Sequence, residues 1–269
     1  MNELLKIYYN CCMTNSPINI DISYEFYPYK DDPALNSYDH LFSINQPKTE
    51  FIEDISSIKP PDKHRHYHPT RNATHRQRHE LFVKGFVFNP LITKKTTELL
   101  NRMKNKHIIG VHSRFHSNKR GAAPSQVLHP EDYMNLLSPE VLISQIYEYI
   151  TKNDISDNDF VVFLATDLQS TQETFKKEFP HNLVINENNQ WISKDLEGMK
   201  DEPHFGWNEK DNAMRERFHR EKPGTRGGQE LLVDVSVLSK CDVFFGSRGS
   251  QMTEWVYNLN PDLLTDEDL

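Results

Sequence analysis

The sequence has few cysteines and no long apolar run. Its 269 residues include three cysteines, Cys11, Cys12 and Cys241. An odd number of cysteines, two of them adjacent in sequence, excludes a disulfide framework and indicates a reducing compartment. No window approaches the ~18 uninterrupted apolar residues of a transmembrane helix, and the first residues lack the basic segment and apolar core of a signal peptide. We therefore expect a cytoplasmic protein with no membrane span.

An excess of positive charge is also lacking. Lysine and arginine number 31 against 39 acidic residues, a formal net charge of −8. A global electrostatic attraction to nucleic acid or to an anionic membrane is therefore not expected, although a local basic pocket stays open. Aromatic residues make up 11% of the chain, which excludes a disordered protein, and the length allows one large domain or two small ones.

One histidine cluster in the first half raises the question of a metal. His64, His66 and His68 alternate, so a strand would place all three on one face, as metal ligands require. Their basic and proline neighbours favour an exposed loop instead, and we expect no metal site. The surrounding basic stretch 63–79 has two interpretations, binding of an anionic acceptor or compensation of the acidic surface, and we favour the second.

The second half alternates between apolar runs and amphipathic segments. Buried strands are expected at 107–112, 160–165, 182–186 and 241–246. Helices are expected from 129, and over 140–152, 170–178, 228–240 and 250–259. Continuous apolar strands that alternate with helices are typical of a parallel α/β sheet, which binds ligands at the carboxyl ends of its strands.

The first half is less regular. Its spacing predicts a helix over 3–13 and a short strand over 17–22, followed by loops through residue 70. Between 80 and 106 the pattern predicts two helices separated at Pro90, the first of which includes Phe86. We expect these two helices to bridge the halves of the chain.

Polar residues follow three of the expected strands. His112 ends the first strand and Arg114 follows it, Asp167 follows the second, and the Gly/Ser-rich run 246–251 begins at the end of the fourth and opens a helix. Such a run offers free backbone N–H groups and the positive end of a helix dipole, which suits a phosphate. Arg114 and Arg248 would add bidentate contacts to an anion. The combination favours a ligand that carries a phosphate or a nucleotide.

Each of these features has a simpler interpretation. An arginine after a strand is often a partner in a surface ion pair. Asp167 could cap the helix that follows it, and Gly246 to Gly249 could form a plain turn. Only their occurrence together favours a nucleotide site.

Three segments of the chain resemble the conserved regions of the α-1,6-fucosyltransferases in order and spacing. The first is 109–114 with 129–134, the second is 163–167, and the third is 232–242 with Ser250 and Gln251. The resemblance runs from about residue 80 to residue 260. It extends to the wider superfamily, which includes the nodulation fucosyltransferases and the protein O-fucosyltransferases.

This resemblance implies an α/β fold with two Rossmann-like domains, that of a GT-B type glycosyltransferase. The N-terminal, acceptor-side domain would be reduced to residues 1–105, bridging helices included, and residues 106–269 would form the nucleotide-sugar-binding domain. The implied activity is inverting, metal-independent transfer of fucose from GDP-fucose to a glycan or polypeptide hydroxyl. No cofactor is implied, because GDP-fucose is the donor substrate.

The resemblance also implies roles for individual residues. Arg114 would bind the diphosphate and help GDP leave, and Asp167 would line the nucleotide site. His112 and Asp234 would recognise the guanine and its surroundings, and a carboxylate can accept both N1–H and N2–H of that base. With the Gly/Ser-rich run, the expected donor-binding set is His112, Arg114, Asp167, Asp234, Ser247, Arg248, Ser250 and Gln251.

The chain departs from the family at the catalytic base. Phe115 replaces a second arginine, and the loop after Arg114 holds no Asp or Glu before residue 131, where the α-1,6 enzymes carry a glutamate. The inverting displacement benefits from a base, and the candidates are His116, His129, a carboxylate from another loop, or none. Lys119 is the counterpart of a family lysine. The acceptor is therefore expected to differ from the N-glycan core, and the alternative function is a catalytically inactive protein that binds nucleotide sugars or glycans.

Overall fold

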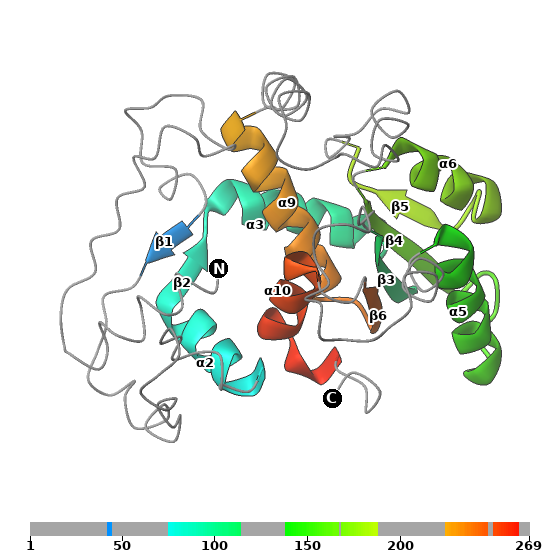
Figure 1. The fold of residues 1–269 in the computed structure, drawn as a ribbon, viewed down its shortest axis with the longest axis horizontal. Helices are drawn as coiled ribbons and strands as arrows, with labels where there is room; N and C mark the ends of the chain where they lie inside the picture. The colour runs from blue at the N-terminus through cyan, green and yellow to red at the C-terminus, as the bar shows by residue number, and fades with distance from the viewer. Residues whose placement is uncertain are drawn as a thin grey trace, which may run out of the picture.

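Four parallel strands form the central sheet, in the order β5-β4-β3-β6 (Figure 1). They are β3 (His107–Ser113), β4 (Phe160–Thr166), β5 (Leu183–Ile185) and β6 (Val243–Gly246). The computed structural model describes residues 42–44, 75–113, 138–166, 168–187, 224–246 and 250–263. Parallel registers such as Gly110 opposite both Phe163 and Phe244 align the carboxyl ends of the strands at one edge. The predicted parallel α/β sheet is confirmed.

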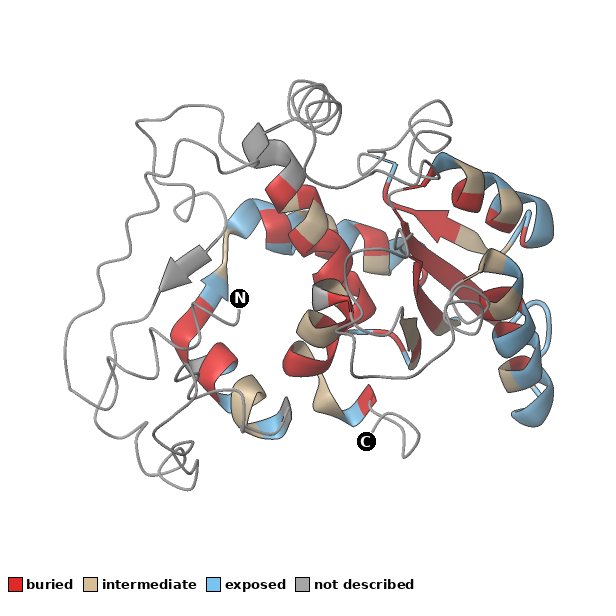
Figure 2. Cartoon of the chain, viewed as in Figure 1, coloured by how far each residue is buried: buried red, intermediate tan, exposed pale blue. Residues whose placement is uncertain are grey.

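Helices cover both faces of this sheet. On one face lie α5 (Pro139–Lys152) and α6 (Gln169–Glu178), and on the other lie α3 (Pro90–Arg102), α9 (Gly224–Leu238) and α10 (Gln251–Leu259). Figure 2 shows the buried residues concentrated in the strands and on the inner sides of these helices.

The core alternates along each strand. In β4, Val162 and Leu164 join the cluster under α5 and α6, whereas Val161 and Phe163 join the cluster under α3, α9 and α10. All seven residues of β4 are buried. This is expected of a strand covered on both faces, and it explains why the strands read as continuous apolar runs in the sequence.

Two helices begin at an asparagine or serine that is followed by proline. The side chain of Asn89 accepts a hydrogen bond from Leu91 N at 2.9 Å, and Ser138 Oγ accepts one from Val141 N at 3.3 Å. Proline has no backbone N–H, but an N–H in the first turn would have no partner within the helix. Its fixed φ also suits a helix start. These caps set the starts of α3 and α5 and explain why both expected helices were visible in the sequence.

The helix expected to include Phe86 ends earlier. Helix α2 spans His75–Gly85, and Phe86 begins strand β2 (Phe86–Phe88), which pairs antiparallel with β1 (Phe42–Ile44). In this position the Phe86 ring stays buried and stacks on Phe82 at 5.3 Å between centroids, while Val87 is exposed. The apolar spacing fits a helix and a strand equally well, and strand pairing with residues far away in sequence decides between them.

Helix α2 packs against α10 and the short 3-10 helix η3 (Pro261–Leu263). The Arg76 guanidinium pairs with Asp262 at 3.1 Å, and His79 Nδ1 lies 3.1 Å from the carbonyl oxygen of Asn258. Residues before 105 therefore contact the end of the chain.

Several expectations lie outside the described residues. These are the helix over 3–13, the strand over 17–22, the helix expected from 129 and the histidine cluster at 64–68. The division into domains 1–105 and 106–269 stays a prediction. Within the described ranges, no helix is both long enough and apolar enough to cross a membrane.

Candidate functional site

Buried polar residues gather where the parallel strands end. His112 and Ser113 end β3, Thr166 ends β4, and Asn186 directly follows β5. All four are buried although they are polar. Open parallel sheets bind ligands at this edge, so we take it as the candidate site.

The first of these residues, His112, is held by helix α10. Its Nδ1 lies 3.0 Å from Thr253 Oγ1, and both side chains are buried. This bond fixes the orientation of the imidazole and therefore the direction of its second ring nitrogen. Space beside it is tight, because a Cβ at Gly246 would come within 2.7 Å of Thr253 Cγ2.

The start of α10 carries a buried hydroxyl. Ser250 is the residue before the helix and is 1% exposed, and its Oγ has no hydrogen-bond partner among the described residues. A buried hydroxyl without a partner costs about 1–3 kcal/mol, which a ligand atom that bonds to it would recover. Together with the backbone N–H groups of the first turn, this hydroxyl suits an anion, although Glu254 in the same turn reduces the local positive potential.

Two carboxylates of α9 meet the end of β5. Glu230 and Asp234 lie one helical turn apart, with 0% and 1% of their surfaces exposed. Asn186 Nδ2 donates to Asp234 Oδ1 at 2.9 Å and to Glu230 Oε2 at 3.1 Å. Lys95 of α3 pairs with the other oxygen of Glu230.

Sequence reasoning identified Asp234 in this group but missed its partners. A signal was available, because Glu230 and Asp234 are four residues apart in an otherwise apolar stretch of helix. That spacing puts both on one helix face, and acidic residues are seldom buried unless they are paired. Asn186 and Lys95 carried no such signal, since only the tertiary structure brings them to α9.

The structure describes part of the expected site. His112 and Ser250 are joined to the same end of α10, and Asp234 lies with Asn186 at the end of β5. Gln251 is the first residue of α10. The remaining expected residues lie outside the described residues, and their roles stay predictions: Arg114, His116, Lys119, Asp167, Ser247 and Arg248.

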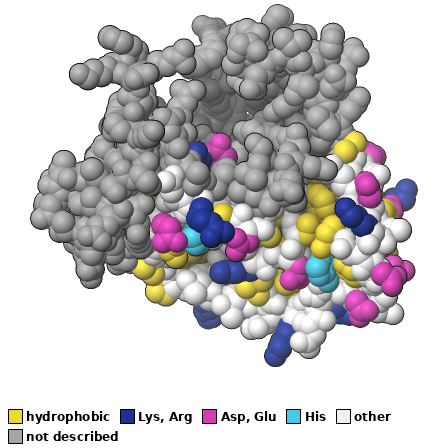
Figure 3. Space-filling model, turned by 90° about the horizontal axis from the view of Figure 1, so that it is seen from below, with side chains coloured by type: hydrophobic (Ala, Val, Ile, Leu, Met, Phe, Trp, Pro, Cys, Tyr) yellow, Lys and Arg dark blue, Asp and Glu magenta, His cyan; other side chains and the backbone are white. Residues whose placement is uncertain are grey.

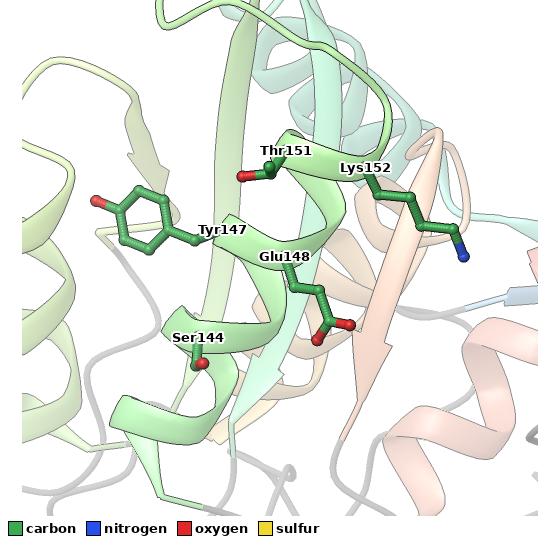
Figure 4. A pocket seen from close by; sticks show the side chains of 5 residues that line it. All are labelled: Ser144, Tyr147, Glu148, Thr151 and Lys152. Atoms are coloured by element: carbon green, nitrogen blue, oxygen red, sulfur yellow. The ribbon is translucent and has the colours of Figure 1, made fainter.

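A separate pocket lies on helix α5. It has a volume of 520 Å³ and is lined by Ser144, Tyr147, Glu148, Thr151 and Lys152, all from that one helix (Figure 4). The C-terminal half of α5 leads into the start of β4, so this pocket is at the edge opposite the candidate site.

One side chain of that pocket is held by the next helix. Tyr147 donates a hydrogen bond to Glu178 at 2.8 Å, and partial burial together with this bond raises the pKa of Tyr147 to about 12. The Tyr147 phenol therefore stays neutral, and its bond to Glu178 is a contact between α5 and α6 at the surface. We assign the pocket no catalytic role.

The described cysteine, Cys241, is not a nucleophile. It is 5% exposed, its Sγ donates to the carbonyl oxygen of Val237, and burial raises the pKa of the thiol. The expectation that Cys241 is a buried apolar residue is confirmed.

Among the described residues, no group of three or more His, Cys, Asp or Glu side chains could hold a metal ion. On the face shown in Figure 3, the lysine and arginine side chains of the described residues are scattered among acidic ones.

No protein-family model matches the sequence, and no curated protein matches it significantly. Solved structures do match. The structure of NodZ α-1,6-fucosyltransferase soaked with GDP-fucose is similar with a TM-score of 0.54 and 15% identity, over 97% of this chain and 88% of that chain. The structure of fucosyltransferase NodZ from Bradyrhizobium gives the same values.

A structure of POFUT1 in complex with GDP is similar at a lower level. Its TM-score is 0.41 at 11% identity, over 70% of this chain and 47% of that chain. At the identity of the NodZ structures the likeness concerns the fold. The chain has a fucosyltransferase-like α/β fold with a parallel sheet, as its sequence predicted.

Proposed function

We propose that the protein is a glycosyltransferase that transfers fucose from GDP-fucose to a hydroxyl of a glycan or polypeptide. The agreement of two observations supports this proposal. The chain is similar in fold to NodZ over 97% of its length, and two of the segments that resemble the α-1,6-fucosyltransferases, 109–114 and 163–167, contain the carboxyl ends of β3 and β4. The fold and the motifs are separate observations that point to the same class of enzyme.

In this proposal, the start of α10 and Arg114 bind the diphosphate. Departure of GDP develops negative charge on the phosphates, and a positioned arginine with a helix N-terminus can stabilise that charge without a metal ion. Ser250 would supply one donor from its buried hydroxyl. Asp234 would accept hydrogen bonds from the guanine, and His112, held by Thr253, would bind beside it.

The base is the part of the mechanism for which the sequence offers the fewest candidates. We propose His116, since a neutral imidazole can accept the proton of an acceptor hydroxyl. Lys119 would lie in the same loop and bind negative charge. Attack from the face opposite GDP would invert the anomeric carbon.

Replacement of Ser250 by alanine should weaken GDP binding without lowering the stability of the fold. The substitution removes a buried hydroxyl that has no partner among the described residues, so the free energy of unfolding should stay the same or rise. Affinity for GDP should fall about tenfold to a hundredfold, the value of one hydrogen bond to a charged group.

Calorimetry with GDP and thermal unfolding of both proteins measure the two quantities. Ser239→Ala is a matched control, because this buried serine bonds to the carbonyl oxygen of Ser236 at the other end of the fold. Equal GDP affinity in Ser250→Ala and in the unaltered protein would remove Ser250 from the phosphate site.

The proposed activity is tested by GDP release from a panel of GDP-sugars and UDP-sugars, with and without pooled glycan and peptide acceptors. Release from GDP-fucose that rises with acceptor is the expected result. Tight GDP binding without release under any acceptor would favour the alternative, a binding protein that lacks turnover. That alternative is supported by Phe115 and by the missing acidic residue after Arg114. Absence of GDP binding would overturn both.

A further inference from the structure

The buried network at the end of β5 joins three separate parts of the chain. Lys95 comes from α3, Asn186 follows β5, and Glu230 and Asp234 come from α9. The contacts run in one line, from the Lys95 ammonium to Glu230, from Glu230 to the Asn186 amide, and from that amide to Asp234. Only Lys95, whose side chain is 26% exposed, reaches solvent to any extent.

The side-chain amide of Asn186 donates hydrogen bonds to two carboxylates. Its two N–H groups serve two different carboxylates, one on Glu230 and one on Asp234. This assigns the orientation of the amide, because its oxygen in the same place would face two anionic acceptors. Neither an aspartate nor a leucine at this position could make both bonds.

The bond from Asn186 is made to one oxygen of Asp234, Oδ1. A carboxylate oxygen has two lone-pair directions, so this bond does not by itself prevent a ligand from donating to the same oxygen. The side chain is thereby held in one rotamer within a buried setting, where a misplaced or unpaired carboxylate is costly. A fixed carboxylate suits a planar ligand that presents two adjacent N–H donors.

We propose that Asn186 and Glu230 are positioning residues, anchored by Lys95, that hold Asp234 to read a purine with N1–H and an exocyclic 2-amino group. The inference rests on the proposed function, since it specifies how the nucleobase of the GDP-sugar is selected. Asp234 would touch the base. Asn186 and Glu230 act through Asp234, and Lys95 acts through Glu230.

The energetic reason is the cost of leaving an acceptor oxygen of Asp234 without its bond. A site built to bond an N–H rejects an analogue that lacks it more strongly than an apolar pocket rejects an extra group. Inosine diphosphate differs from GDP only by the missing 2-amino group, so it reports on one bond to Asp234. Loss of one bond to a charged group corresponds to a preference for GDP of about tenfold or more.

The experiment compares Kd for GDP and for inosine diphosphate by calorimetry on the full chain. In the unaltered protein we expect GDP to bind about tenfold more tightly. Asp234→Asn should remove that preference. Asn186→Leu and Glu230→Gln should lower it to about threefold or less, while affinity for both diphosphates stays measurable through the phosphate contacts.

One further variant is a control outside the network, and another is a second test at its end. Asn260→Leu removes a comparable amide bond, from Asn260 to the carbonyl oxygen of Ser239, and should leave the preference unchanged. Lys95→Met alters the partly exposed end of the network, so it decides the question if Asn186→Leu does not fold. Circular dichroism and thermal unfolding identify the folded variants.

The outcomes separate this inference from the proposed function. An unchanged GDP preference in the folded variants at 95, 186 and 230 would overturn the positioning role. Equal binding of GDP and inosine diphosphate by the unaltered protein would overturn base reading by Asp234, while GDP-dependent transfer would still stand. Failure to bind either diphosphate would instead remove the proposed function itself.

Discussion

Arg114→Ala should lower kcat for fucose transfer by at least about 100-fold, the usual cost of removing a group that stabilises developing charge. The physical reason is that GDP leaves as an anion, and the arginine that follows β3 would bind its diphosphate in the transition state more strongly than in the ground state. Turnover is measured as GDP release with saturating acceptor, and the fold is checked by circular dichroism.

The control for this variant is Arg102→Ala. Arg102 is the exposed last residue of α3, so its loss changes the net charge equally without touching the candidate site. Arg102→Ala should transfer fucose at the original rate. If Arg114→Ala transfers as well as the unaltered protein does, the assignment of the diphosphate site is wrong.

Gly110→Ala should destabilise the fold by about 1–3 kcal/mol, the usual cost of overpacking a core. A Cβ at this position would lie 2.7 Å from Cys241 Sγ and 3.1 Å from both Cys241 Cβ and Leu238 Cδ2. Gly110 is in the middle of β3, between two paired strands, so the backbone cannot move away without disturbing both registers. Thermal or urea unfolding measures the loss.

A double variant tests the cause. Cys241→Ala removes the sulfur and should recover part of the loss in Gly110→Ala, which makes the two effects non-additive. Additive losses would show that the contact with Cys241 is not the source of the destabilisation. In the same experiment, the remaining 3.1 Å contacts should keep the recovery incomplete.

The strands and helices around the sheet could be predicted well because each has a local signal. β4 is a run of seven apolar or small residues, and its observed span, Phe160–Thr166, extends the expected one by a single residue. α3 and α5 begin at Asn-Pro and Ser-Pro pairs that are visible in the sequence. The order of the strands was not predicted, since it depends on pairings between segments far apart in the chain.

The site was predictable where motifs mark it and not where tertiary contacts build it. His112 and Asp234 belong to recognisable segments, and both turn out to be buried polar residues held by a hydrogen bond. In the sequence, Asn186 looks like an ordinary polar residue at the end of the expected strand 182–186. Its importance depends on two residues of α9, Glu230 and Asp234, which lie 44 and 48 positions later, so no local pattern could reveal it.

The strand order has a consequence for how the chain folds. β3 is paired on one side with β4, which follows within some fifty residues, and on the other with β6, whose Val243 pairs with Ile109. During synthesis, β3, β4 and β5 with α5 and α6 can assemble first. The apolar side of α3 must wait for α9 and α10 to emerge. One face of the sheet therefore stays open to other chains until α9 and α10 have been synthesised, and we expect this late closure to slow folding and to make it sensitive to concentration.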